Sequence, residues 1–179
     1  MAKQAILIID IQNDFTGENA KFPVDKNQAI QMINNLNRLL SSVDLADTEI
    51  VYIGNEYAKW NLLNVFRNFA AIRDTDGAKQ DARLHILSKN YFSKTKGNSF
   101  SNPKLDTFLK ENDIKEVFIS GLYAEACIYA TVRGAIRNKY ATTVLSDCVA
   151  TKSDEKRAQT LTKIEKLGAK IMLSNAFFN

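Results

Sequence analysis

The stretch VFISGLYAEACIY, residues 117–129, is the part of the sequence that most clearly indicates the fold. Its first three residues are β-branched or aromatic, as expected of a buried strand, and Gly121 ends that strand. Cys127 follows six residues later, and small and apolar residues continue at helical spacing to Ala135. Cys127 is therefore predicted to lie where a strand turns into the first turn of a helix. Unsatisfied N–H groups and the helix dipole favour an anion there, so its thiol pKa is expected to be lowered and the thiolate to be reactive. The alternative is a buried cysteine that only packs.

The composition is that of a single domain covering residues 1–179. Hydrophobic residues make up 45% of the 179-residue chain, which is enough for a sizeable core. The net charge is +4, but the lysines and arginines are scattered among acids. Because no basic block with interleaved aromatics occurs, no nucleic-acid partner is expected.

The N-terminal apolar run AILII is followed by Asp10, which leaves it too short for a signal-peptide core or a membrane span. The chain has two cysteines, Cys127 and Cys148, so no disulfide framework is predicted. Cys148 is interpreted as a packing residue. These features indicate a cytoplasmic protein with reduced thiols and no membrane partner.

Buried strands alternate with helices along the chain. Apolar or β-branched runs predict strands, and capped segments with apolar residues three and four apart predict helices. The expected strands are 5–11, 49–53, 83–88, 117–121, 141–146 and 170–173, and the expected helices are 25–43, 103–110, 127–139 and 153–167. This alternation predicts an α/β, three-layer Rossmann-like fold with a six-stranded, mostly parallel sheet and helices on both faces.

Residues 58–82 are the least regular part of the chain. Trp60, Leu63 and Phe66 indicate a short amphipathic helix rich in aromatic residues. A helix packed against the core is the interpretation that we favour, and a lid over a pocket or a contact between subunits is the alternative. An exposed apolar helix would make the protein a homo-oligomer, a dimer or a tetramer.

Four polar residues are predicted to share one edge of the sheet. Asp10, Asn55, Lys89 and Cys127 each follow the end of a predicted strand, and ligand sites of such folds lie at the carboxyl ends of the strands. Asp10 can accept the thiol proton and pass it to a leaving amine, while an ammonium at Lys89 can stabilise both anions. Backbone N–H groups at the turn can receive an oxyanion. The alternative for Lys89 is a surface lysine.

Three motifs occur in order at these strand ends: IIDIQNDF at residues 8–15, with Lys89 at the end of the predicted third strand, GLYAEACIYATVRGA at 121–135, and SDCVAT at 146–151. With these motifs the chain resembles the isochorismatase-like cysteine hydrolases, which include nicotinamidases, N-carbamoylsarcosine amidases and ureidoacrylate hydrolases. The resemblance covers residues 5–150.

The resemblance implies a catalytic triad of Asp10, Lys89 and Cys127. It also implies a cis peptide bond between Leu122 and Tyr123, with the amides of Tyr123 and Cys127 forming an oxyanion hole. Phe15 matches a position that lines the substrate pocket in the family.

The departures from the family pattern are also informative. Asn55-Glu56-Tyr57 stands where nicotinamidases carry an Asp-x-His pair, so neither a metal nor another cofactor is expected. Tyr123 would narrow the pocket or add a hydroxyl to it, and Asn55 is a further candidate contact with the substrate. Glu125 is expected to point away from the thiol, since residues two apart lie on different helix faces.

These observations predict a metal-independent cysteine hydrolase that cleaves a C–N bond of a small amide or ureide through an acyl-thioester. A catalytically silent binding protein on the same scaffold is the alternative. A third hypothesis is a thiol sensor that uses Cys127.

Overall fold

The structure is a computed structural model that describes residues 3–178. Six strands form one sheet in the order β3-β2-β1-β4-β5-β6, and every neighbouring pair is parallel. Their bounds are β1 Lys3–Ile9, β2 Thr48–Asn55, β3 Tyr91–Lys94, β4 Ile114–Leu122, β5 Ala141–Ala150 and β6 Lys170–Met172. The predicted α/β fold with a six-stranded sheet is confirmed, and its strands are parallel throughout.

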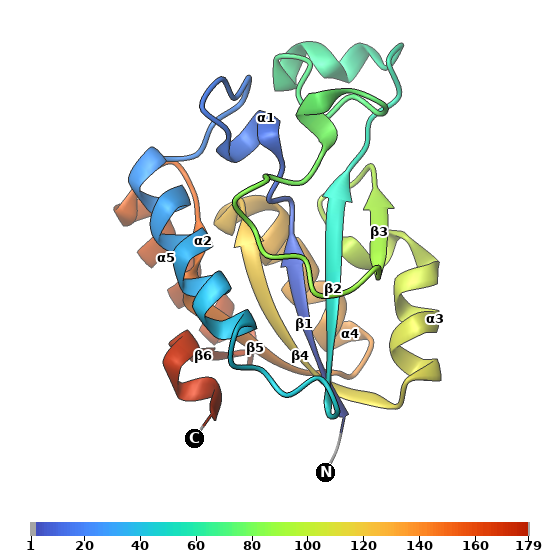
Figure 1. The fold of residues 1–179 in the computed structure, drawn as a ribbon, viewed down its shortest axis with the longest axis vertical. Coiled ribbons are helices and arrows are strands. Elements are labelled where there is room, and N and C mark those ends of the chain that lie inside the picture. The colour runs from blue at the N-terminus through green and yellow to red at the C-terminus, as the bar shows by residue number, and fades with distance from the viewer. Residues whose placement is uncertain (1–2, 179) are drawn as a thin grey trace.

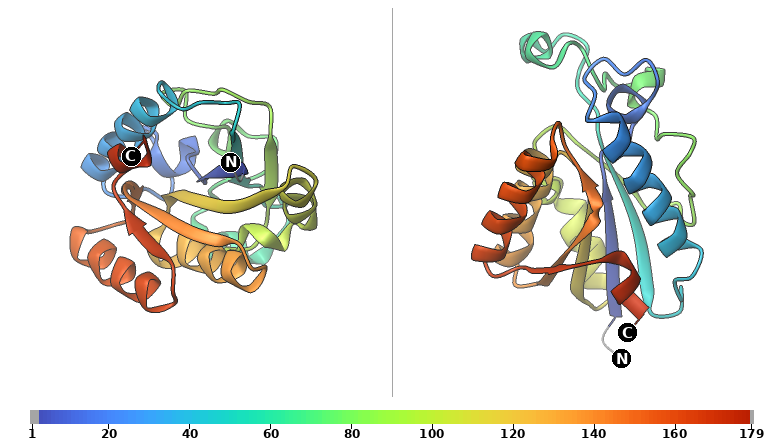
Figure 2. Two further views of the ribbon diagram at one scale, coloured as in Figure 1. Left: turned by 90° about the horizontal axis from the view of Figure 1, so that it is seen from below. Right: turned by 90° about the vertical axis from the view of Figure 1, so that its left-hand side faces the viewer.

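Helices cover both faces of the sheet (Figures 1 and 2). The helix α2 (Lys26–Leu40) packs on one face, and α3 (Pro103–Glu111), α4 (Tyr129–Arg137) and α5 (Asp154–Lys166) pack on the other. Alternate residues of β1 serve the two faces, because Ile8 packs with α2 while Leu7 packs with the opposite helices. This two-sided burial explains why the strand is an uninterrupted apolar run.

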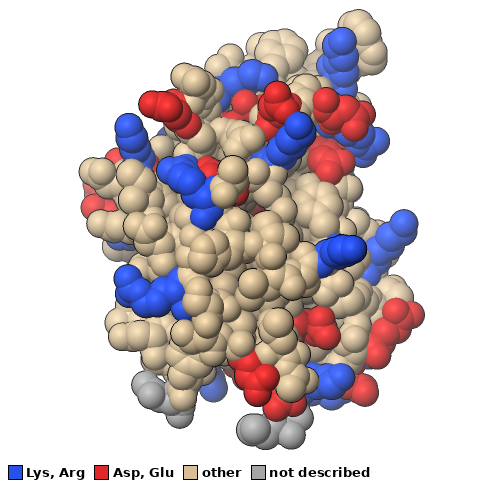
Figure 3. Space-filling view, viewed as in Figure 1, with Lys and Arg blue, Asp and Glu red and all other residues tan. Residues whose placement is uncertain are grey.

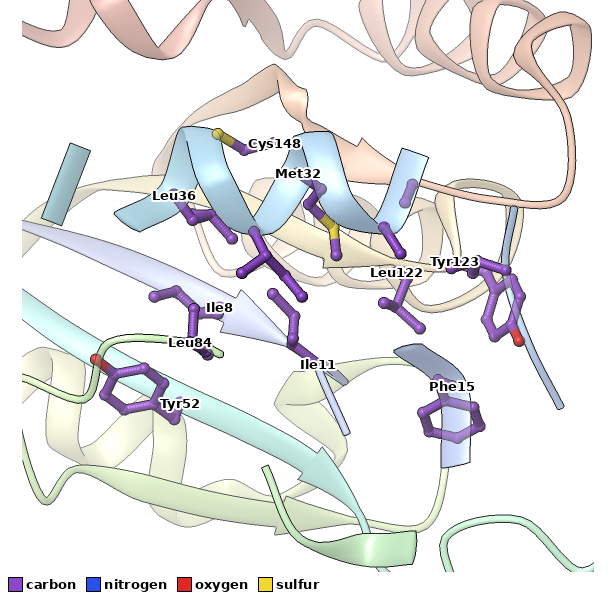
Figure 4. Packing of buried hydrophobic residues seen from close by; sticks show 14 of the residues in the cluster. Ile8, Ile11, Phe15, Met32, Leu36, Tyr52, Leu84, Leu122, Tyr123 and Cys148 are labelled. Atoms are coloured by element: carbon purple, nitrogen blue, oxygen red, sulfur yellow. The ribbon is translucent and has the colours of Figure 1, made fainter. Parts of the chain in front are cut away.

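The α2 side of the core extends from the middle of the sheet to its carboxyl edge (Figure 4). Met32 and Leu36 of α2 lie over Ile8, and the same cluster continues to Phe15 and Tyr123 beyond the strand ends. Phe15 belongs to α1 (Asn13–Thr16), a short helix that follows β1. The core therefore supports the loops in which the predicted site residues lie.

The predicted third strand at 83–88 is wrong. Leu84 enters the core, but His85, Ile86 and Leu87 are exposed. Side chains rather than a strand partner hold this backbone, since the Tyr52 hydroxyl donates to the His85 carbonyl at 2.9 Å and accepts from the Leu87 N–H at 3.0 Å. The strand that pairs with β2 is β3, a few residues further on.

Residues 58–70 form an arm that projects beyond the carboxyl edge of the sheet (Figures 1 and 2). Its 3-10 helix, Leu62–Arg67, exposes its apolar side chains, with Phe66 80% exposed. Trp60, which precedes this helix, is 88% exposed. The favoured prediction of a core-packing helix is therefore wrong. Backbone hydrogen bonds close the base of the arm, from the Tyr57 N–H to the Ala71 carbonyl at 2.9 Å and from the Arg73 N–H to the Tyr57 carbonyl at 2.9 Å.

The surface charges and the lengths of the described helices bear on possible partners of the protein. On the face shown in Figure 3, basic and acidic side chains are interspersed. Within residues 3–178, no helix is both long enough and apolar enough to cross a membrane.

Candidate active site

Three segments far apart in the sequence bring an acid, an ammonium and a thiol together. Asp10 directly follows β1, Lys94 is the last residue of β3, and Cys127 lies in a single π-helical turn between β4 and α4. The Lys94 Nζ is 2.8 Å from the Asp10 Oδ2 and 3.4 Å from the Cys127 Sγ. All three residues are buried, and Cys127 keeps 8% of its surface exposed.

The lysine of this group is Lys94, not the predicted Lys89. Lys89 is exposed and precedes β3, whereas Lys94 ends that strand beside Asn55 of β2. The error follows from placing the strand at 83–88. The missed signal is the run YFSK at 91–94, a short aromatic strand sequence that ends in a lysine and lies in a stretch interpreted as a polar loop.

Asn55 lies within the site and orients the lysine. Its Oδ1 accepts a hydrogen bond from the Lys94 Nζ at 2.9 Å, and its Nδ2 lies 3.9 Å from the Cys127 Sγ. The Gln12 side chain holds the Asn55 backbone at both ends, accepting from its N–H and donating to its carbonyl, each at 2.9 Å. Gln12 is a positioning residue that sequence reasoning missed.

The backbone around Asp10 is also unusual. Asp10 has a φ of 60°, a left-handed conformation that aspartate tolerates better than most residues. Gly121 of the neighbouring strand has a φ of 113°, and a Cβ there would collide with the Ile9 backbone. Only glycine therefore allows β4 to approach β1 this closely, which brings the turn holding Cys127 toward Asp10.

The two carboxylate oxygens of Asp10 differ, because Oδ2 accepts a hydrogen bond from Lys94 and Oδ1 does not. Its Oδ1 is buried and has no hydrogen-bond partner among the described residues. A buried carboxylate oxygen without a donor is costly and is free to accept a proton or a hydrogen bond.

The electrostatics of the site correct the prediction of a lowered thiol pKa. Burial and, next to it, the negative charge of Asp10 raise the pKa of Cys127 to about 12, although the Lys94 ammonium acts to lower it. For Lys94, burial is the largest influence and acts to lower its pKa, but Asp10 and Cys127 together raise it above the ordinary value. Cys127 is therefore a thiol near neutral pH, and Lys94 is an ammonium.

Tyr123 directly precedes the π-helical turn that holds Cys127. The Leu122–Tyr123 peptide bond is cis, as the family resemblance implied. The Tyr123 ring packs edge-to-face against Phe15, with 5.9 Å between ring centroids, and against Phe22 at 5.6 Å. Its hydroxyl donates to the Phe22 carbonyl. Tyr123 and Phe15 thus lie side by side beyond the end of β4 (Figure 4).

Glu125 points away from the sulfur, as predicted. Its carboxylate accepts a hydrogen bond from the Thr151 hydroxyl and lies 3.2 Å from the Lys156 Nζ. Nearby, Glu56 is paired with Arg73 at 3.4 Å. In the part of the chain that the structure describes, no three His, Cys, Asp or Glu side chains are grouped so that they could hold a metal ion.

Comparison with known proteins connects this geometry to a family. The isochorismatase domain family matches residues 4–176 of the chain. The crystal structure of an isochorismatase-like hydrolase from Alkaliphilus metalliredigens has a TM-score of 0.91 and 26% sequence identity, covering 99% of this chain and 98% of that one. N-carbamoylsarcosine amidase from Thermoplasma acidophilum shares the fold at a TM-score of 0.82 and 20% identity, with 96% of each chain covered.

A relative described as a probable inactive nicotinamidase, from Arabidopsis thaliana, is 25% identical over 178 residues, covering 93% of this chain and 90% of that protein. The class defined by the fold is the isochorismatase-like hydrolases, and the chain belongs to the isochorismatase family. This confirms the resemblance that the sequence motifs indicated, and the match extends it to residue 176.

Proposed function

We propose that this protein is a metal-independent cysteine hydrolase that cleaves a C–N bond of a small amide or ureide. One observation carries the proposal: a single buried ammonium, that of Lys94, lies 2.8 Å from the Asp10 carboxylate and 3.4 Å from the Cys127 sulfur. Nucleophilic acyl transfer requires a sulfur nucleophile, a base to take its proton, and a cation to stabilise the developing thiolate.

The first half of the reaction forms the acyl-enzyme. Asp10 accepts the Cys127 proton while the sulfur attacks the substrate carbonyl, which forms a C–S bond and moves the carbonyl electron pair onto oxygen. The backbone N–H groups of Tyr123 and Cys127 are the proposed donors to that oxyanion. Its collapse breaks the C–N bond, and Asp10 returns the proton to the departing amine, which leaves a thioester.

In the second half, Asp10 removes a proton from a water that attacks the thioester. The C–S bond breaks, the acid is released, and Cys127 regains its proton. Because the pKa of Cys127 is raised to about 12, proton transfer to Asp10 has to accompany sulfur attack instead of preceding it. The open Oδ1 of Asp10 is suited to this transfer.

The experiment that tests the proposal measures amine release from a panel of small amides and ureides. The wild type and a Cys148→Ala variant, which removes the other free cysteine, should turn over the same substrates. Cys127→Ala should lose turnover, and mass spectrometry of the wild type should find the acyl adduct at Cys127. Unchanged turnover in Cys127→Ala would overturn the proposal.

The second candidate is a catalytically silent binding protein. Tyr123 packs against Phe15 beside the site and Cys127 is only 8% exposed, a geometry that would also result if the tyrosine had closed the pocket. This candidate predicts no turnover across the panel and no reaction of Cys127 with iodoacetamide. The thiol-sensor hypothesis is weaker, because the raised pKa of Cys127 leaves little thiolate to react with oxidants.

We also propose that the protein is a homo-oligomer and that it is located in the cytoplasm. The apolar side chains exposed on the arm, residues 58–70, fit a homo-oligomer in which arms pack against another copy of the chain. Cys127 and Cys148 are both free thiols, which fits a reducing compartment and favours the cytoplasm.

A further inference from the structure

The π-helical turn that carries Cys127 has one side chain that can anchor it. Of the residues in this turn, Ala124–Ile128, only Glu125 and Cys127 have polar side chains. Tyr123, at the N-cap of the turn, gives no side-chain hydrogen bond to its N–H groups. The unsatisfied N–H groups at the start of the turn therefore have Glu125 as their nearest side-chain acceptor.

The Glu125 carboxylate is bound by three groups. It accepts hydrogen bonds from its own N–H and from the Thr151 hydroxyl, and the Lys156 Nζ lies 3.2 Å away. Burial acts to raise the pKa of Glu125, but these contacts outweigh it and hold the pKa below its ordinary value. The side chain is therefore a carboxylate near neutral pH, and a negative charge is favourable at the start of a helical turn.

Thr151 is itself fixed by the opposite layer of the protein. It is fully buried, its N–H donates to the Gln28 Oε1 at 2.9 Å, and its carbonyl accepts from the Asp25 N–H at 2.9 Å. Both partners lie at the start of α2, whereas α4 packs on the other face of the sheet. The Thr151 hydroxyl thus gives Glu125 a rigid point of attachment outside the turn.

The shape of the turn makes this attachment important for Cys127. The Tyr123 carbonyl accepts hydrogen bonds from the N–H groups of Ala126 and Ile128, each at 3.1 Å. Among the residues that the structure describes, the Cys127 N–H is not a donor to that carbonyl, although it lies between the other two in the sequence. Such π-helical turns are rare. Without the contacts of Glu125 we expect the turn to relax and the sulfur to move.

We propose that Glu125 is a positioning residue whose contact with Thr151 holds Cys127 in the geometry that the reaction requires. Lys156 is half exposed, so its ion pair contributes less than the buried hydroxyl does. This inference rests on the proposed hydrolase function and adds to it a residue that acts through the backbone of the turn.

Turnover and thiol reactivity should change in opposite directions when the anchor is removed. In Glu125→Ala and in Thr151→Val we expect kcat to fall about 10- to 100-fold with KM within about threefold, because the reacting groups are misplaced. Alkylation of Cys127 by iodoacetamide at neutral pH should become about tenfold faster, since the anchored residue is only 8% exposed. An amine-release assay and mass spectrometry measure the two rates.

Cys148 is the internal control for loss of the fold. It is fully buried and packs on the α2 side of the sheet, so its alkylation should stay slow in both variants. Two matched substitutions should behave as the wild type. Thr151→Ser keeps the hydroxyl, and Glu155→Gln removes an exposed carboxylate of α5 that accepts from Gln159.

The alkylation rates separate this inference from the hydrolase proposal, because they need no substrate. A gain confined to Cys127 supports the anchor even when the wild type cleaves no amide. Equal rates in wild type and Glu125→Ala, or equal gains at Cys127 and Cys148, would refute the anchor whatever the outcome for catalysis. An active wild type whose kcat is unchanged in Glu125→Ala would also refute it, and would leave the hydrolase proposal standing.

Discussion

At the scale of single residues, the Lys94 ammonium links the Asp10 carboxylate to the Cys127 sulfur. Lys94→Met should lower turnover by about 100-fold or more, because it removes the cation that stabilises charge at the sulfur and orients Asp10. It should also lower the free energy of unfolding by about 3–5 kcal/mol, since a buried carboxylate loses its partner. Denaturant titration and an amine-release assay measure the two effects.

Lys89→Met is the control for that substitution. Lys89 is exposed and lies outside the site, so its replacement should leave activity unchanged and stability within about 0.5 kcal/mol. Loss of activity in Lys89→Met with normal activity in Lys94→Met would show that Lys89 is the catalytic lysine, as the sequence predicted.

The raised pKa of Cys127 gives a prediction about pH. A thiol with a pKa of about 12 instead of 9.0 holds its proton across the whole range near neutrality. The rate of alkylation by iodoacetamide should therefore rise about tenfold per pH unit and continue to rise beyond pH 9, where an ordinary thiol levels off. Mass spectrometry of Cys127 measures the rate, and the urea-unfolded chain supplies the ordinary profile. A plateau of the alkylation rate near pH 9 in the folded protein would contradict the raised pKa of Cys127.

At the scale of elements, α1 is tied to the segment that replaces the predicted third strand. The Asp81 carboxylate accepts hydrogen bonds from the Thr16 hydroxyl at 2.6 Å and from the Arg83 guanidinium at 2.6 Å. Burial acts to raise the pKa of Asp81, but these hydrogen bonds outweigh it and lower the pKa to about 2. The contact joins Thr16, the last residue of α1, to the loop that follows the arm.

Asp81→Asn should lower the free energy of unfolding by about 2 kcal/mol at neutral pH. A carboxyl whose pKa is depressed on folding contributes stability above its unfolded pKa, near 3.8, and this contribution is lost as the pH falls toward 2. The difference between wild type and variant should therefore shrink between pH 4 and pH 2. Urea titrations across that range measure it, and a constant difference would show that the ionised carboxylate is not the cause.

At the scale of the whole molecule, the arm predicts self-association. We expect the wild type to sediment as a dimer or tetramer, and the variant Trp60→Glu with Phe66→Glu to sediment as a folded monomer. Both side chains are mostly solvent-exposed in the single chain, so their replacement costs the fold little.

The matched control is Ile86→Glu with Leu87→Glu, which charges a second exposed apolar pair away from the arm. It should leave the sedimentation of the wild type unchanged. A monomeric wild type would end the proposal of a homo-oligomer.

Prediction from sequence succeeded where a local pattern has a single structural meaning. Capped helices were expected at 25–43 and 103–110, and the Asp25 and Asn102 side chains each accept a hydrogen bond at the start of α2 or α3. Asp10, Asn55 and Cys127 were expected at strand ends and were found together. The inferences about Asp10, Asn55 and Cys127 each depended on a buried strand with an uninterrupted apolar run.

Prediction failed where two segments had similar composition. RLHILS at 83–88 and YFSK at 91–94 both suit a strand, and only the space beside β2 decides between them. The segment chosen wrongly then supplied the wrong lysine. The prediction of a lowered pKa for Cys127 failed for a related reason. It used the helix terminus, which is a local feature, whereas the burial and the charge of Asp10 that raise this pKa arise from distant parts of the chain.

The sequence by itself determined the α/β architecture, the family and the cysteine, because buried strands and short motifs carry that information locally. The tertiary structure alone decided which lysine meets the thiol and how strongly the thiol holds its proton. These properties depend on distances and burial between segments far apart in the chain, and such distances are set by packing, not by the order of residues.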